Sequence, residues 1–404
     1  MTLELNKLTV QVEAMGRALA TRRSEHARLA AQARELLEKH AQVTDELREK
    51  LKIAVQTDAS WRGADPLGDR LDERHMSANP SRPATLVAAD GSQIYLDPHG
   101  IAMYYLLNIG SIVLRQGTGE APDTRTMPEV FFEESDLYDE AQRLVESDRV
   151  NAERNQREIK ALADLATAER SALGGDISRP IITLLDGPLL LWPPQRAPDV
   201  EQRQRVEEFA IELDRLKAAQ AIPLGYVDRP NSANMLRLLH LAELSESQIN
   251  KDTLRASPYR SLADRVLFDD LAPGERTALF ATTSEVNASY QRAGHRICFF
   301  YLNVSRIPGP EAARIARVEV PEWVARDPEK LDIAQAAVYA DCVLTGYPYV
   351  LARAHELALV SQEERAAFEE MLRIQMVRQG LIPEMSRKAA LKALTGGARR
   401  REWR

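Results

Sequence analysis

The chain has 404 residues, of which 44% are hydrophobic and 28% are charged, as in a globular protein with room for a large core. Its formal net charge of -7 argues against a broadly basic nucleic-acid coat, although a local basic track could still bind phosphates. Two cysteines and the lack of a long apolar run indicate neither a disulfide framework nor a membrane span. Because the first residues also lack a signal-peptide pattern, we expect a cytoplasmic protein.

The N-terminal region, residues 1–56, contains no proline and repeats apolar side chains at helical or heptad spacing, as at Leu8, Val12 and Met15. This pattern predicts one long helix or a helical hairpin. Its charged faces favour packing on a partner or a second subunit over burial in a core. Residues 57–83 are polar and rich in Asp, Arg, Pro and Ser, which is typical of a linker or an extended arm.

A compact domain is expected over residues 84–390, followed by a basic tail over 391–404. Its strands come first and then alternate with helices, which predicts an α/β fold with a mixed sheet flanked by helices and a C-terminal helical extension. The expected strands are 85–90, two within 100–113, a short one after 128, 181–186, 222–227 and 296–304. The expected helices are 136–173, 200–220, one after 231, one from about 328 and one after 348, while 245–275 resembles a flexible insertion.

Two apolar strands each end in an Asp-Gly pair. The first spans 85–95 and carries Asp90, and the second spans 181–192 and carries Asp186. A charge inside an apolar strand is costly unless something pairs with it, and a bound cation is a common partner. Asp-Gly is also a common turn dipeptide, so each aspartate alone could simply begin a turn. Together the two strands favour a pair of metal-ligand carboxylates brought side by side in one sheet.

A third carboxylate could come from the helix that leads into the second strand. Glu169 is best placed near the end of that helix, and Glu158 and Glu153 lie further up as alternatives. Metal-assisted phosphodiester cleavage needs clustered carboxylates that hold divalent ions, and hard oxygen ligands suit Mg²⁺ or Mn²⁺. Each glutamate alone is also an ordinary residue for a solvated helix face.

A further cluster of candidate residues lies at 341–356. Pro348 suits the first turn of a helix, and His355 follows almost two turns later. A histidine near two carboxylate-bearing strands could ligate metal or protonate a leaving oxygen. The alternative is a core histidine whose hydrogen bonds are satisfied within the fold.

Basic side chains gather at the end of the chain. Between 373 and 404 there are nine arginines and lysines, against only Glu384 and Glu402. This track could bind phosphates, or it could be a solvated tail.

These blocks resemble the NurA family of nucleases, which has an RNase H-like core. The resemblance rests on Val87–Ser92, Leu184–Leu189 and Gly346–Glu356 in this order, and it covers roughly residues 84–390. It implies a Mn²⁺- or Mg²⁺-dependent DNA nuclease with 5'-3' exonuclease and single-strand endonuclease activity. It also implies a homodimer that acts with a HerA-type hexameric DNA-translocating ATPase in DNA end processing and repair or in phage defence.

The resemblance also assigns residues to roles. The first and second Asp of the family match Asp90 and Asp186, its helix Glu matches Glu169, and its late His matches His355. The carboxylates would be catalytic metal ligands, and the histidine a ligand or a proton donor. A lysine would be expected after the strand at 222–227, and an arginine is our candidate for its phosphate-facing role. The DNA-binding candidates are therefore Arg229, Tyr347 or Tyr349, Arg353, Arg387 and Lys388.

The sequence lacks the motifs of two other function classes. The sequence has no Gly-x-x-x-x-Gly-Lys-Ser/Thr loop, so any DNA motor would have to be a partner, and it has no Gly-x-Ser-x-Gly elbow of a serine hydrolase. One alternative is a non-catalytic adaptor that docks a DNA motor through the N-terminal helices and the basic tail. Another is a phosphoesterase for small phosphates or RNA. The adaptor leaves both strand-borne carboxylates unexplained, so the nuclease is favoured.

Overall fold

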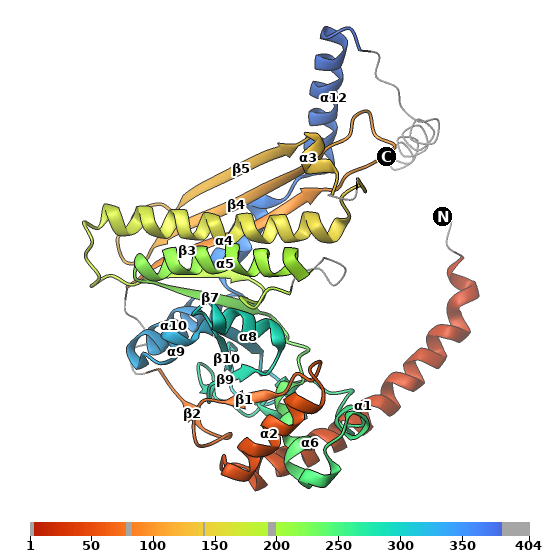
Figure 1. The fold of residues 1–404 in the computed structure, drawn as a ribbon, viewed down its shortest axis with the longest axis vertical. Helices are drawn as coiled ribbons and strands as arrows, with labels where there is room; N and C mark the ends of the chain where they lie inside the picture. The colour runs from red at the N-terminus through yellow and green to blue at the C-terminus, as the bar shows by residue number, and fades with distance from the viewer. Residues whose placement is uncertain (1–3, 78–82, 140–141, 193–198, 382–404) are drawn as a thin grey trace. The chain divides into compact units, whose positions relative to one another are not determined.

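The computed structural model describes residues 4–77, 83–139, 142–192 and 199–381 (Figure 1). The chain divides into two compact units, each assembled from segments that are distant in the sequence. Unit 1 takes Met1–Pro83, Asp186–Leu191 and Ile222–Tyr349, and unit 2 takes Ala84–Leu185, Trp192–Ala221 and Val350–Arg404.

Unit 2 contains a mixed sheet with the strand order β6-β3-β4-β5. The antiparallel strands are β3 (Thr85–Ile94), β4 (Tyr105–Arg115) and β5 (Asp123–Phe131), and β6 (Ile181–Asp186) pairs with β3 in parallel. The short α3 (Glu134–Leu137) and the long α4 (Ser147–Ala172) make the crossover from β5 to β6. A parallel neighbour requires such a crossover, so the helix follows from the sheet topology.

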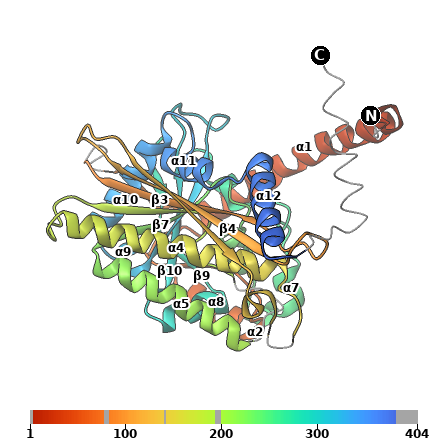
Figure 2. The ribbon, with the colours of Figure 1, turned by 90° about the horizontal axis from the view of Figure 1, so that it is seen from above.

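Helices cover both faces of this sheet (Figure 2). One face packs on α4, whose buried Ile159, Leu162 and Ala166 form a stripe at helical spacing, and α5 (Asp199–Ala218) packs on α4. The other face packs on α11 (Tyr349–Ala358) and α12 (Gln362–Arg378). Because strand side chains alternate between faces, Tyr105 and Leu107 cluster on the α4 side, while Tyr104 and Leu106 cluster on the α12 side.

Unit 1 contains antiparallel strands in the order β7-β11-β10-β9-β1, with β8 pairing β10 and β2. These strands are β1 (Ala64–Pro66), β2 (Arg74–His75), β7 (Ala221–Val227), β8 (Arg276–Thr277), β9 (Phe280–Thr282), β10 (Ile297–Asn303) and β11 (Ile315–Pro321). The helices are α1 (Thr9–Lys39), α2 (Asp45–Thr57), α6 (Asn234–Glu243), α7 (Lys251–Arg255), α8 (Glu285–Arg292), α9 (Glu322–Ala325) and α10 (Pro328–Cys342). Figure 1 shows α1, α2 and α6 packed together, and their apolar side chains share one core with β9 and β10.

The predicted α/β class is confirmed: the structure has a mixed sheet flanked by helices, a long N-terminal helix and C-terminal helices. The N-terminal region forms two successive helices, α1 and α2, and both pack on α6. The predicted helix over 136–173 is interrupted, and its long part begins at Ser147. The last predicted helix is two helices, because Ser361 caps the start of α12. Within the described residues, no helix is both long and apolar enough to cross a bilayer.

Three expectations need correction. The N-terminal helices were expected to pack on a partner and not to be buried in a core. In the structure, the second half of α1 and α2 contribute to the unit 1 core through side chains such as Leu37 and Leu51. Within the expected linker, residues 57–77 are instead part of the folded unit, because they contain β1, β2 and the buried Trp61 and Leu71. Residues 245–275 are no loose insertion, since their widely spaced apolar side chains are buried in the same core. The predicted tail, 391–404, lies outside the described residues.

Asp264 illustrates how residues 245–275 are anchored in the unit 1 core. Its carboxylate is fully buried and accepts hydrogen bonds from the backbone N–H groups of Met235 and Leu236 at the start of α6, and from the Tyr301 hydroxyl. We expect Asp264→Ala to lower the free energy of unfolding by about 2–4 kcal/mol, because three buried donors lose their acceptor. Urea unfolding measures this loss. Asp264→Asn keeps one acceptor oxygen and should lose less; equal midpoints for the alanine variant and the unmodified protein would contradict this account.

Candidate active site

Asp90 lies at the point where one edge of β3 becomes open. The parallel register runs from Thr85 and Ile181 to Ala89 and Leu185, and each residue of this last pair is followed in the chain by one of the two predicted aspartates. Beyond Asp90, β3 continues to Ile94 and pairs only with β4. A carboxylate at this level therefore emerges from the sheet instead of being enclosed by strands on both sides.

His355 of α11 contacts Asp90 directly. Its Nδ1 lies 2.6 Å from Asp90 Oδ2, while the backbone N–H of Gly91 donates to Oδ1 at 2.8 Å. The Asp90 side chain is 15% exposed and the imidazole is 56% exposed. The structure thus brings together two of the predicted site residues that are 265 positions apart in the chain. The imidazole is held from one side and accessible on the other.

Gly110 explains how α11 reaches this position. It pairs with Asp90 across β3 and β4, and the backbone of α11 passes directly over it. A Cβ at Gly110 would lie 2.4 Å from the Ala358 nitrogen and 2.5 Å from the Ala354 oxygen, distances that real side chains do not adopt. The absence of a side chain here is therefore a condition for the contact between Asp90 and His355.

The next cross-strand pair holds the end of the same helix. Ser92 pairs with Asn108, and both side chains donate to the carbonyl oxygen of Ala358, the amide of Asn108 at 2.8 Å. Carbonyl groups in the last turn of a helix have no partner within the helix, so two side-chain donors stabilise this end. Together with Gly110, this pair fixes the height and position of α11 over the strands.

Glu158 of α4 approaches from the opposite face of the sheet. Glu158 is 5% exposed, and its Oε1 lies 2.8 Å from the position that a Cβ on Gly91 would occupy. The Nε of Arg154, one turn earlier, lies 3.2 Å from the same oxygen. Gly91 is part of β3 and starts no turn, so its lack of a side chain serves the close approach of α4. By contrast, Gly187 has φ +119°, and there the turn interpretation is correct.

Glu169, predicted as the third carboxylate, is at the wrong end of the strand. It forms a two-pronged ion pair with Arg115, with Nε to Oε2 at 2.9 Å and Nη2 to Oε1 at 2.5 Å. Arg115 pairs with Thr85, which is five residues from Asp90, or roughly 16 Å along a strand. Hydrogen bonding to Glu169 raises the pKa of Arg115. Glu169 therefore lies at the N-terminal end of β3, far from Asp90. Glu153 pairs with Arg157 instead.

The remaining candidates are spread over both units. In unit 1, Tyr347 stands edge-on to Tyr226 with 5.5 Å between ring centroids, Tyr349 is 42% exposed, and Arg229 is exposed with φ +44°. In unit 2, Arg353 forms an ion pair with Glu356 on α11. The two basic candidates in the tail, Arg387 and Lys388, lie outside the described residues.

The donor types suit a hard divalent cation. Asp90 and Glu158 offer carboxylate oxygens, and His355 offers an imidazole nitrogen. Asp90 Oδ1 is oriented by a backbone N–H, as is usual for an aspartate whose other oxygen serves as a ligand. The described residues contain no ready-made cluster of three or more His, Cys, Asp or Glu side chains that could hold a metal ion. Arg154 occupies the space next to Glu158 that a cation would need.

Comparison with known proteins gives the following matches. A family model of the NurA domain matches residues 84–360. No protein with a curated description matches the sequence. The NurA nuclease from Sulfolobus solfataricus is similar in structure at 12% identity and a TM-score of 0.43, over 85% of this chain and 98% of that one. Human ENDOV matches at 13% identity and 0.32, over 80% and 97%. A NurA structure bound to dAMP and manganese matches at 10% identity and 0.32, over 79% and 90%.

The packing at Gly110 leads to a prediction about α11. Gly110→Ala should push the helix off the strands and lower stability by about 1–3 kcal/mol, because the new methyl group meets backbone atoms that cannot rotate away. Hydrogen–deuterium exchange of α11 should accelerate. Gly16→Ala is the control, since nothing lies within 4 Å of the Cβ it would add. Unchanged exchange in α11 would show that the helix is not held where we describe it.

Proposed function

Because the chain belongs to the NurA family and is therefore a nuclease, we propose that it is a deoxyribonuclease that hydrolyses phosphodiester bonds with Mn²⁺ or Mg²⁺. The observation that carries this proposal is the meeting of Asp90, Gly91 and His355 at the open edge of β3, with Glu158 on the other side of Gly91. A NurA protein of known structure binds dAMP and manganese, which supports the same chemistry for this chain.

We propose Asp90, Asp186 and Glu158 as the metal ligands. Leu185 pairs with Ala89, and Asp186 is the next residue, so its Cα lies about 3.8 Å from that of Leu185. Asp90 and Glu158 lie on opposite faces of β3, but among the residues that the structure describes no strand pairs with β3 on the β6 side beyond this level. A cation in that opening would be within reach of carboxylates from both faces. Glu158 thus takes the role for which Glu169 was the first choice.

The bound ion would supply the activated water and would polarise the phosphate. In this scheme Asp90 is a ligand of the ion, and His355 is the general acid that protonates the leaving oxygen. Water adds to phosphorus, the bond from phosphorus to the leaving oxygen breaks, and the imidazolium donates its proton to that oxygen. The hydrogen bond to Asp90 keeps the imidazole ring in place.

We further propose that the protein acts as a homodimer together with a HerA-type hexameric translocase. In unit 1, the N-terminal half of α1 exposes a series of apolar side chains, which supports a protein-binding role: Val10, Val12, Met15 and Leu19. The 5'-3' exonuclease and single-strand endonuclease activities, and a place in DNA end processing or in phage defence, are proposed on family membership alone. The cytoplasmic location and DNA contacts by Arg229, Tyr347, Tyr349 and Arg353 stay predictions.

The choice between the two helix glutamates can be tested directly. Glu158→Gln should reduce Mn²⁺-dependent cleavage of single-stranded DNA at least a hundredfold, because a neutral amide is a poor ligand for a hard cation. Glu169→Gln should keep most of the activity and only lower stability, since it breaks the ion pair with Arg115. Asp90→Ala and Asp186→Ala should be as inactive as Glu158→Gln.

Melting temperatures of all variants separate loss of chemistry from loss of fold. If Glu169→Gln loses cleavage while Glu158→Gln keeps it, the ligand set proposed here is wrong. If neither aspartate variant loses cleavage, the metal-dependent mechanism itself is wrong.

His355 is expected to act on the chemical step. His355→Ala should lower kcat by about 10²–10⁴ with little change in KM, because proton transfer contributes a factor of this size. His99→Ala is the matched control, since this histidine is also exposed and belongs to unit 2. Single-turnover kinetics with excess enzyme measures the step. Equal rates for the two variants would remove His355 from the mechanism.

A further inference from the structure

An ion pair links Glu158 to Arg154, and a chain of hydrogen-bonded side chains extends from Arg154 along the α4 face of β3. Gln93 belongs to β3, which ends at Ile94, and Tyr95 follows the strand. Both side chains lie on the α4 side, because Gln93 contacts Arg154 and Tyr95 contacts Asn151. On the helix, Asn151 and Arg154 lie seven and four positions before Glu158 and thus on one side of α4. The strand and the helix together present a continuous polar surface that starts at the proposed metal site.

Each member of this surface is held by its neighbour. Arg154 donates through Nη1 to Gln93 Oε1 at 3.1 Å, Gln93 donates through Nε2 to the Tyr95 hydroxyl at 2.8 Å, and that hydroxyl donates to Asn151 Oδ1 at 2.7 Å. The ring of Tyr95 is thereby fixed at its far end. These hydrogen bonds fix the side chains to one another, so binding would require little further ordering.

Tyr95 is 40% exposed even though its hydroxyl is hydrogen-bonded twice. An exposed aromatic ring that cannot rotate away is a platform on which an unstacked nucleobase can lie, and stacking of this kind tolerates any base. The ring stands four residues from Gly91, or roughly 13 Å of extended chain. This spacing suits a base a few nucleotides from the phosphodiester that is cleaved.

Arg154 supplies the positive charge of the surface. Its side chain is 27% exposed, and its Nε lies 3.2 Å from Glu158 Oε1. A divalent cation held by Glu158 would compete with this ion pair and repel the guanidinium. The planar guanidinium is well shaped to bind two phosphate oxygens instead.

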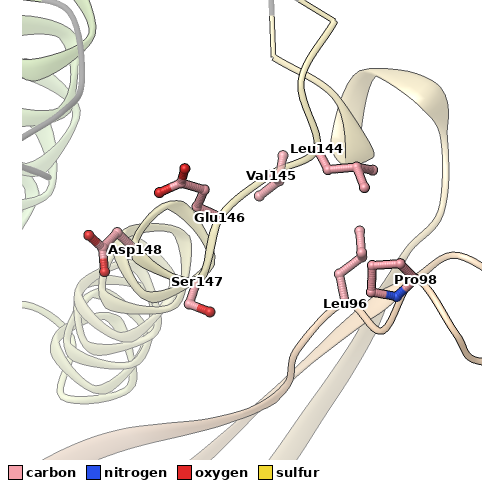
Figure 3. Close-up of a pocket in the computed structure, with 7 residues that line it drawn as sticks. All are labelled: Leu96, Pro98, Leu144, Val145, Glu146, Ser147 and Asp148. Atoms are coloured by element: carbon pink, nitrogen blue, oxygen red, sulfur yellow. The ribbon is translucent and has the colours of Figure 1, made fainter.

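The surface ends at a pocket of about 420 Å³ (Figure 3). Leu96 follows Tyr95 on one side, and Ser147 lies one helical turn before Asn151 on the other. The lining residues are Leu96, Pro98, Leu144, Val145, Glu146, Ser147 and Asp148. The pocket is thus remote from Asp90, and its carboxylates disfavour phosphate, so it marks the far end of the polar surface.

We propose that Gln93, Tyr95, Asn151 and Arg154 bind the single DNA strand next to the cleaved bond. One base stacks on the ring of Tyr95, and Arg154 contacts a backbone phosphate. This inference rests on the proposed nuclease function and adds a binding site for the substrate strand. It commits to an unpaired strand, because a base inside a duplex has no free face to place on the ring.

The test uses the full-length protein with Asp90→Ala, which binds without cleaving, and a fluorescent oligothymidylate. Tyr95→Ala should weaken binding of the single strand about tenfold, as expected for one stacked base, while Tyr95→Trp should retain it. Phe132→Ala is the control, because Phe132 is also exposed, belongs to unit 2 and lies outside this surface. Binding of a blunt duplex should respond to none of these changes.

A series of oligonucleotides that each carry one abasic site gives the sharper result. At one position, loss of the base should weaken binding to the parent protein about tenfold and should have no further effect on Tyr95→Ala. The inference is overturned if the effects of the abasic site and of Tyr95→Ala add at every position. It is also overturned if Tyr95→Ala binds the intact single strand with an affinity within twofold of the parent protein. If the unmodified protein shows no Mn²⁺-dependent cleavage, the proposed function is wrong; if it cleaves DNA but Tyr95 has no effect, only this inference is wrong.

Discussion

The site depends on one feature of the sheet: a parallel strand stops where its neighbour continues. β3 and β6 pair in register as far as Ala89 and Leu185, and the next residue of each strand is an aspartate. A carboxylate enclosed within a sheet would lose its hydration without compensation, which is strongly unfavourable. At the end of β6 the edge of β3 is open, and the Asp90 side chain there is 15% exposed. In the proposed site a cation would bind at this opening and displace Arg154 from Glu158.

Two glycines then determine what reaches this opening from each face. Gly110 lets the backbone of α11 lie against β4 and brings His355 to Asp90. Gly91 lets α4 approach β3 from the other side and brings Glu158 near the same level. A Cβ at Gly110 would meet the backbone of α11, and a Cβ at Gly91 would meet the side chains of Arg154 and Glu158 on α4. The glycine of the Asp-Gly pair in β3 is therefore required by packing, although the same dipeptide commonly marks a turn.

The sequence alone predicts β3, β6, β7 and β10, because apolar runs bounded by polar residues are a local signal. It predicts two strands within 100–113, where the structure has the single strand β4. It also predicts the pairing of Asp90 with His355, through motifs whose order resembles a known family. It does not predict which glutamate of α4 faces the site. Glu158 and Glu169 are three turns apart on one helix, and only the packing of α4 on β3 decides that Glu158 meets Gly91 while Glu169 meets Arg115.

The errors in unit 1 have a related cause. Residues 57–83 and 245–275 are mostly polar, and their few apolar side chains are too widely spaced to show a period. These side chains are buried because they contact α1, α2 and α6, which are distant in the sequence. Burial of this kind is a property of the tertiary fold, so no local pattern of 57–83 or 245–275 could reveal it.

The most direct test of the account is the position of a bound metal ion. A crystal structure of the full-length protein soaked with Mn²⁺ would locate the ion by its anomalous scattering. The account predicts Mn²⁺ at about 2.1–2.4 Å from carboxylate oxygens of Asp90, Glu158 and Asp186, with Arg154 displaced from Glu158. Mn²⁺ bound at Glu169, or at a position that touches neither Asp90 nor Glu158, would contradict it.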